Sequence, residues 1–200
     1  MEFKSLFNGN NFDGWISQNT GGTPEWTAEN GVMTVVPGKG NIYTAEKFRD
    51  FMLHIEFMIP INDGTCFRAN GMLQNGNSGV YIQGCYEIQV LNTYAREPIT
   101  YQFCGSVYAT YEPRENACTP PGTWQTYDIF FRAAKLGESG EVTSPAAVTI
   151  IHNGVVVQNN VEFDHVTPGG MTDCVVEEGP IMLQAHDDVV HFRNIRIARL

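Results

Sequence analysis

The segment from Asn77 to Asn92, N-S-G-V-Y-I-Q-G-C-Y-E-I-Q-V-L-N, constrains the fold of this chain more than any other. Apolar and polar residues alternate on both sides of Gly84, which predicts two antiparallel strands joined by a tight turn. One predicted face carries Val80, Ile82, Ile88 and Val90, and the opposite face carries Tyr81, Gln83, Glu87 and Gln89. An exposed row of Tyr, Gln and Glu suits a sugar-binding surface, although any solvated sheet face can look the same.

The rest of the chain repeats this pattern. Alternation predicts strands at 51–59, 124–133 and 190–200, and the Asn-Gly pairs at 30–31 and 153–154 predict hairpins over 26–36 and 147–157. Ten to twelve short strands with Gly and Asn turns, and no βαβ alternation, predict an all-β antiparallel sandwich, most simply a jelly roll. We expect one domain over residues 1–200 and one helical turn at 45–48.

Two long segments, 93–122 and 164–179, show no periodicity. A structureless loop of nearly thirty residues is longer than a compact domain usually tolerates without a functional reason. We therefore expect the first segment to fold over one face of a sheet.

The charge of the chain narrows the class of partner. The net charge is -10 and Lys and Arg form no cluster, which argues against nucleic acid and anionic membranes. No apolar run is long enough to span a membrane. A neutral partner such as a carbohydrate fits better.

The cysteines contain no C-x-x-C pair, so a structural zinc site is not expected. Cys104 and Cys118 could form a disulfide in an oxidising compartment, or could be small buried hydrophobic residues.

Four motifs in order carry a family resemblance. They are F-N-G-x-N-x-D-G-W from Phe7, the segment from Asn77, P-P-G-x-W-Q-T-Y-D-I from Pro120, and G-P-I-x-L-Q-x-H with F-R-N-I-R-I from Gly179. Together the motifs resemble the 3-keto-disaccharide hydrolase family. The resemblance implies a concanavalin A-like jelly roll of two curved sheets and cleavage of glycosides oxidised to a ketone at C3. It also implies export from the cell.

The first residues, Met1-Glu2-Phe3-Lys4, include no apolar signal segment. The protein is therefore either cytoplasmic or shown after removal of a signal. The resemblance favours the second reading, so we expect a periplasmic or secreted protein.

The pattern around Glu87 lacks a second acid. Related concanavalin-like glucanases carry E-x-D-x-x-E on one strand, whereas this chain reads E-x-Q-x-x-N from Glu87 to Asn92. Standard glycosidases need two carboxylates, and Gln89 and Asn92 cannot replace one. A C3 ketone offers another route, in which a base removes the C2 proton, the C1 oxygen leaves and water adds.

His186 and Glu87 are the predicted catalytic residues. His186 could be the base or a metal ligand, since an imidazole titrates near pH ~6.5. Glu87 could be a second base, a partner that orients His186, or a metal ligand. A divalent cation held by both would stabilise an enolate, so a metal cofactor is a possibility left open. Asp187 or Asp188 could orient His186, since the family's usual D-H-G arrangement is missing here. A structural histidine and a solvated carboxylate are the plain alternatives.

A further set of polar and aromatic residues is predicted to bind the sugar. Amide side chains suit hydroxyl groups, aromatic rings stack on sugar rings, and an arginine could polarise the ketone or neutralise Glu87. The candidates are Gln89, Gln83, Gln184, Tyr81, Tyr108, Trp124, Arg193 and Asn77, with Arg68 a weaker one. His152, beside an Asn-Gly turn, is expected at the surface.

The predicted partner is therefore an oxidised di- or oligosaccharide or glycoside. The alternative is a carbohydrate-binding module without catalysis, since one fold serves many functions. An ordinary two-carboxylate glycosidase is the weakest reading.

Overall fold

The computed structural model describes residues 2–61 and 75–200, and within these residues it contains fifteen strands and no helix. The strands are β1 (Lys4–Ser5), β2 (Trp15–Ser17), β3 (Thr27–Glu29), β4 (Val32–Thr34), β5 (Ile42–Thr44), β6 (Phe51–Met58), β7 (Ser78–Ile82), β8 (Tyr86–Val90), β9 (Trp124–Arg132), β10 (Lys135–Leu136), β11 (Val142–Ser144), β12 (Ala146–His152), β13 (Val155–Phe163), β14 (Met182–Leu183) and β15 (His191–Arg199).

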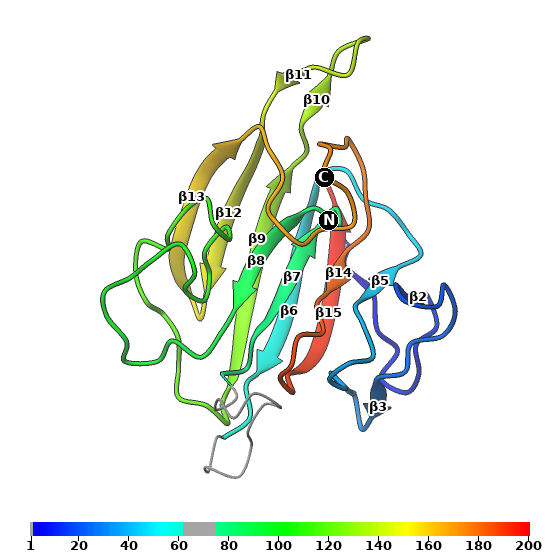
Figure 1. The fold of residues 1–200 in the computed structure, drawn as a ribbon, viewed down its shortest axis with the longest axis vertical. Helices are drawn as coiled ribbons and strands as arrows, with labels where there is room; N and C mark the ends of the chain where they lie inside the picture. The colour runs from blue at the N-terminus through cyan, green and yellow to red at the C-terminus, as the bar shows by residue number, and fades with distance from the viewer. Residues whose placement is uncertain (1, 62–74) are drawn as a thin grey trace.

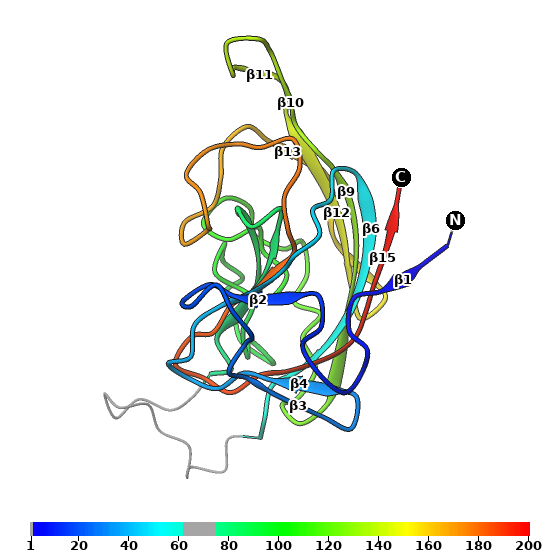
Figure 2. The same ribbon diagram turned by 90° about the vertical axis from the view of Figure 1, so that its right-hand side faces the viewer.

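The strands form two antiparallel sheets and one small hairpin (Figure 1). The larger sheet has eight strands in the order β13-β12-β9-β6-β15-β4-β3, with β1 beside β15. The smaller sheet has the order β2-β5-β14-β7-β8. In Figure 2 the larger sheet forms one curved layer, and most of the remaining chain lies on one side of it. The predicted jelly-roll sandwich is confirmed, with more short strands than expected.

The core lies between the two sheets because alternation gives each one apolar face. The predicted inward side chains of β6, β7 and β8 are all buried; they are Phe51, Leu53, Ile55, Phe57, Val80, Ile82, Ile88 and Val90. Pairing of Tyr81 with Glu87 across β7 and β8 sets the register of this hairpin. The polar set therefore faces away from the core, as predicted.

A loop covers the free edge of the smaller sheet. The Gln89 N–H donates to the Ser106 carbonyl at 3.1 Å, and the Tyr108 N–H donates to the Glu87 carbonyl at 3.0 Å. Because β8 is the last strand of its sheet, this segment satisfies backbone groups that an open edge would expose. Residues 93–122 were predicted to fold over one face of a sheet; the structure instead pairs residues 105–108 with the edge strand β8.

A second loop crosses the β7–β8 turn. The Thr167 N–H donates to the Cys85 carbonyl at 3.0 Å, and the Met171 N–H donates to the Gly84 carbonyl at 2.7 Å. The two loops bury the polar face of the hairpin, so the prediction of an exposed row is wrong. Tyr81 is 0% exposed and Glu87 is 3% exposed.

Two local predictions are also wrong. Residues 45–48 form no helical turn, because Phe48 exchanges two backbone hydrogen bonds with Gly179, at 2.8 and 3.0 Å. His152 is fully buried, since alternation along β12 points it into the core. Its Nε2 lies 3.0 Å from Gln125 Oε1, and burial lowers its pKa to about 4.

Cys104 and Cys118 are free and buried, as the alternative of small buried hydrophobic residues expects. Cys66 and Arg68 lie outside the described residues. In the part of the chain that the structure describes, we find no helix with the length and apolar character to span a membrane.

Candidate active site

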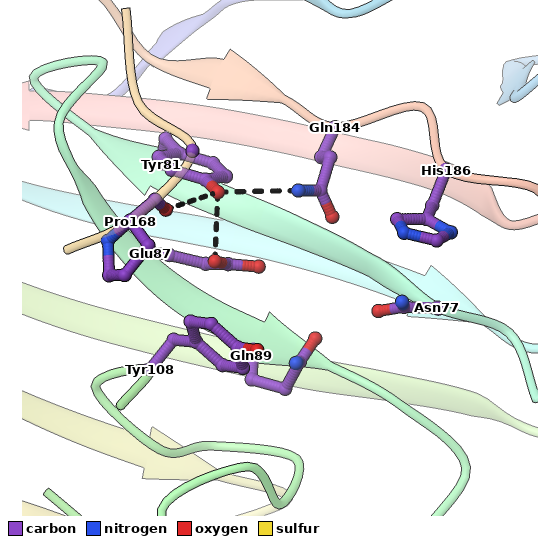
Figure 3. Close-up of a pocket in the computed structure, with 9 residues that line it drawn as sticks. Asn77, Tyr81, Glu87, Gln89, Tyr108, Pro168, Gln184 and His186 are labelled. Carbon is purple, nitrogen blue, oxygen red and sulfur yellow. Dashed lines mark hydrogen bonds between the residues drawn. The ribbon is translucent and has the colours of Figure 1, made fainter. Parts of the chain in front are cut away.

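A pocket of about 170 Å³ opens on the polar face of the smaller sheet. The described residues that line it are Asn77, Tyr81, Glu87, Gln89, Tyr108, Pro168, Gly169, Gln184 and His186 (Figure 3). Seven of these were predicted as site residues. They come from β7 and the residue before it, from β8, from the segment after β14 and from the two covering loops, so the fold gathers residues far apart in the sequence.

The floor of the pocket is a hydrogen-bonded pair. The Tyr81 hydroxyl lies 2.8 Å from Glu87 Oε2 and can donate to it. The Glu87 carboxylate points toward the space between Gln184, Gln89 and His186 (Figure 3). The Glu87 N–H, in turn, donates to Thr167 Oγ1 at 2.7 Å, which fixes the strand beneath the carboxylate.

Tyr81 does not stack on a ligand, contrary to its predicted role, because its ring is fully buried. Gln184 Nε2 donates to its hydroxyl at 3.2 Å, and the Pro168 carbonyl lies 3.1 Å away as a second acceptor. These contacts make Tyr81 a residue that positions Glu87.

Burial controls the acidity of this pair. Removal from water raises the pKa of Glu87 to about 7, and the hydrogen bond from Tyr81 lowers it in part. Burial, followed by the Glu87 charge, raises the pKa of Tyr81 well above its usual value. Near neutral pH, therefore, Glu87 can exchange a proton while Tyr81 stays protonated.

His186 stands at a more open part of the pocket, with 41% of its side chain exposed. Its Nδ1 lies 3.6 Å from Asp187 Oδ2, which is an electrostatic contact too long for a hydrogen bond. Asp188 has another role, since its Oδ2 accepts from the backbone N–H groups of Asn75 and Asn77 at 3.0 and 2.7 Å. Of the two aspartates, Asp187 is the one placed to influence His186.

The predicted metal site remains a prediction. Glu87 and His186 line the same pocket, as that prediction requires. Among residues 2–61 and 75–200, no three His, Cys, Asp or Glu side chains gather closely enough to hold a cation. Any ion here would have to draw further ligands from amide oxygens, substrate or water.

Two glycines that pack against Glu87 and Tyr81 were not predicted from the sequence, and one of them, Gly169, lines the pocket. A Cβ at Gly79 would lie 2.5 Å from Glu87 Oε1, and one at Gly169 would lie 2.8 Å from the Tyr81 hydroxyl. Gly169 also has a φ of +82°, a conformation that side chains disfavour. The T-P-G-G sequence at 167–170 signals a tight turn, but nothing local shows what the turn covers.

Three predicted residues lie elsewhere. Arg193 and Trp124 are on the outer face of the larger sheet, because their strands place the opposite face in the core. Arg193 Nε donates to Glu56 Oε2 at 2.6 Å, and its guanidinium lies 3.9 Å from the Trp124 ring centre, so it does not neutralise Glu87. Gln83 shares the face of Glu87 but donates to the carbonyls of Phe48 and Glu177 at 3.1 Å each.

Comparison with known proteins agrees with this architecture. Residues 2–198 match the 3-keto-alpha-glucoside-1,2-lyase-like domain. A candidate glycosyl hydrolase from Parabacteroides distasonis ATCC 8503 is 38% identical, with a TM-score of 0.87 over 99% of this chain and 84% of that chain. No match was found among curated proteins.

Two further candidate glycosyl hydrolases from the same organism share the fold. One is 20% identical with a TM-score of 0.72, over 99% of this chain and 94% of that chain. The other is 22% identical with a TM-score of 0.67, over the full length of both chains.

Proposed function

Because the chain belongs to the 3-keto-alpha-glucoside-1,2-lyase-like family, we propose that it cleaves glycosides whose sugar ring is a ketone at C3. One observation carries this proposal. Glu87 is the single carboxylate among the described residues that line the pocket. Ordinary glycoside hydrolysis needs two carboxylates, whereas a C3 ketone acidifies the C2 proton enough for one base to start the reaction.

Glu87 is the proposed base. Its carboxylate takes the C2 proton, and the electron pair of the C–H bond moves toward the C3 oxygen to form an enolate. A pKa of about 7 suits this step, because a base is most effective when it is ionised yet still basic at the working pH. The Tyr81 hydroxyl holds the carboxylate in place at 2.8 Å.

Elimination follows from the enolate. Its electrons close a double bond between C1 and C2 while the bond from C1 to the leaving oxygen breaks. His186, in the more open part of the pocket, is the proposed donor of the proton that the leaving oxygen takes. Water then adds across the double bond, with hydroxyl to C1 and hydrogen to C2, so the net change is hydrolysis.

The enolate oxygen needs a hydrogen-bond donor or a cation. Asn77, Gln89 and Tyr108 line the pocket with groups that can donate to it. A divalent ion could do the same as a Lewis acid. Dialysis against a chelator, followed by addition of single divalent metals, tests the ion directly through loss and recovery of turnover.

The first experiment uses a 3-keto-glucoside with a chromogenic leaving group and the matching unoxidised glucoside. We expect release from the keto compound alone. Glu87→Gln should lower kcat about 10²–10⁴-fold, the usual contribution of a general base. Glu138→Gln, at an exposed site in the β10–β11 hairpin, is the matched control and should keep full activity. Equal turnover of both glucosides would contradict the proposal.

The second experiment separates elimination from direct hydrolysis. In D₂O, elimination and hydration place deuterium on C2 of the product, whereas direct displacement at C1 leaves the original hydrogen there. Mass and NMR spectra of the freshly released sugar, corrected for exchange in buffer, read out the difference.

A carbohydrate-binding module without catalysis is the alternative, since the pocket offers amide and phenol groups that suit sugar hydroxyls. Binding of unoxidised glycans without turnover of any keto-glycoside would favour it.

A further inference from the structure

Two buried cysteines lie close together where residues 93–122 cover the edge of β8. Cys104 comes directly before residues 105–108, which pair with β8, and Cys118 lies in the later part of the same segment. Both are free thiols, with exposures of 1% and 7% respectively. Two thiols placed together in a core, with no part in the proposed reaction, point to chemistry of their own.

The two thiols contact each other beside Leu91, the residue after β8. Each cysteine side chain interacts with the other, and Cys104 is also hydrogen-bonded to the backbone of Leu91. Cys118 Sγ can donate to the Leu91 carbonyl at 3.7 Å. Since a disulfide forms only between cysteines whose side chains are close, this contact meets its first requirement.

Neighbouring polar groups hold the sulfur atoms in place. Cys104 Sγ lies 3.1 Å from the Tyr127 hydroxyl, which donates to the Gln89 carbonyl at 2.6 Å. Cys118 Sγ lies 3.7 Å from the carbonyl of Thr119. Because Gln89 lines the candidate active site, Tyr127 connects the thiol pair to the strand that carries the pocket.

The two thiols differ in a way that suits stepwise oxidation. Cys118 is the less buried of the two, and the hydrogen bond from Cys104 lowers the pKa of its thiol. Burial raises the pKa of the Cys104 thiol well above its usual value. The thiolate is the form that attacks a disulfide, so Cys118 is placed to react first and Cys104 second.

We propose that Cys104 and Cys118 are a redox pair, and that oxidation converts them to a disulfide that fixes segment 104–118 against β8. The oxidant is a small-molecule disulfide, which local opening of the segment admits. The Cys118 thiolate, its proton lost to water, attacks one sulfur of the oxidant, breaks the S–S bond and releases a first thiolate. Cys104 gives its proton to that thiolate and attacks Cys118 Sγ, and the second thiolate leaves and takes a proton from water. Two protein thiols and one small disulfide thus become one protein disulfide and two small thiols.

The disulfide acts on one wall of the pocket. Tyr108 belongs to the closed segment and lies beside Gln89 in the pocket (Figure 3). The bond closes a loop of fifteen residues, 104–118, which restricts the unfolded chain and opposes local opening of the segment. The wall that carries Tyr108 is therefore more firmly held in the oxidised protein, whether or not the pocket catalyses the proposed reaction.

The test equilibrates the parent protein in buffers with graded ratios of oxidised to reduced glutathione. Acid stops the exchange, the remaining thiols are alkylated in denaturant, and a peptide map identifies every linked cysteine. We expect the oxidising buffers to yield a peptide in which Cys104 is joined to Cys118. Both cysteines alkylated at every ratio, or either one joined to a different cysteine, would overturn the proposal.

Cys174→Ser is the matched control, because Cys174 is exposed. This variant should form the disulfide between Cys104 and Cys118 as the parent does, and it removes the thiol most open to glutathione adducts. Cys104→Ala should form no disulfide at Cys118. The peptide map of the parent decides the pairing by itself, so the proposal can be refuted even where a core variant folds poorly.

Two physical measurements check the effect of the bond on the segment. Oxidation should raise the Tm of the parent by about 5–10 °C, given the length of the closed loop. It should also slow hydrogen exchange at the amides of residues 105–108 about ten-fold or more, relative to those of β6. In Cys104→Ala the same change of buffer should alter neither quantity. A disulfide that forms in the parent and leaves both unchanged would overturn the proposal that it fixes the segment.

Discussion

At the scale of single residues, the chemistry of the site depends on how Glu87 is held. Glu87 is 3% exposed, and Tyr81 is the hydrogen-bond partner that the structure gives its carboxylate. A buried anion with one neutral donor is poorly compensated for its lost hydration, which is why its pKa rises to about 7. The cost in stability and the basic character of Glu87 have the same cause.

Tyr81→Phe should move the pH dependence of turnover upward. The phenol stabilises the ionised form of Glu87, so its loss raises the pKa of Glu87 further. A hydrogen bond to a charged group contributes about 1.5–3 kcal/mol, which corresponds to a shift of about one to two pH units. The pH profile of kcat/KM measures it. An unchanged profile with reduced activity would mean that Tyr81 acts only by packing.

Gly79→Ala should displace the Glu87 carboxylate. The new Cβ would lie 2.5 Å from Oε1, a distance that real contacts do not reach. We expect a large loss of kcat and a loss of about 1–3 kcal/mol in unfolding free energy, as other overpacked sites show. Gly22→Ala is the control, because its nearest neighbour, Thr20 Oγ1, would be 3.6 Å away. Full activity in Gly79→Ala would refute the assigned position of Glu87.

At the scale of structural elements, the hairpin of β7 and β8 was predictable and its surroundings were not. Alternation is local, so the sequence predicts that Val80 and Tyr81 face opposite ways. Burial of Tyr81 depends on Pro168 and Gly169, which contact its hydroxyl and which no local pattern connects to it. The same limit explains why Arg193 and Trp124 were wrongly assigned to the site. Alternation predicts the face of the strand on which each side chain lies, but it does not predict which of the two sheets the strand joins.

The loop at 164–179 is attached to the β7–β8 hairpin through Thr167, so substitution of Thr167 tests this attachment. Its hydroxyl accepts from the Glu87 N–H at 2.7 Å and can donate to the Cys85 carbonyl at 3.2 Å. Thr167→Val keeps the shape but removes the acceptor of the buried Glu87 N–H, whereas the Cys85 carbonyl keeps its hydrogen bond from the Thr167 N–H. We expect a loss of about 1–3 kcal/mol by urea denaturation. Thr167→Ser retains the hydroxyl and should lose less; equal losses in both would contradict this role.

At the scale of the whole molecule, two buried groups give opposite contributions to the pH dependence of folding. The pKa of Glu87 is raised in the folded state, so its contribution to stability is present below pH ~4.5 and is lost as the pH rises to about 7. The pKa of His152 is lowered, so its contribution is present above pH ~6.5 and is lost as the pH falls to about 4. Each change amounts to roughly 3 kcal/mol, and the two nearly cancel between pH 4.5 and 6.5.

Replacement of Glu87 should therefore reveal the contribution of His152 to the pH dependence of folding stability. Glu87→Gln removes one of the opposing contributions, so the variant should gain about 3 kcal/mol relative to the parent between pH 4.5 and 7. Urea denaturation of both proteins at matched pH values measures this difference, and all groups common to both proteins cancel from it. A difference that stays constant with pH would mean that Glu87 titrates normally. In that case the buried carboxylate could not act near neutral pH as the proposed base.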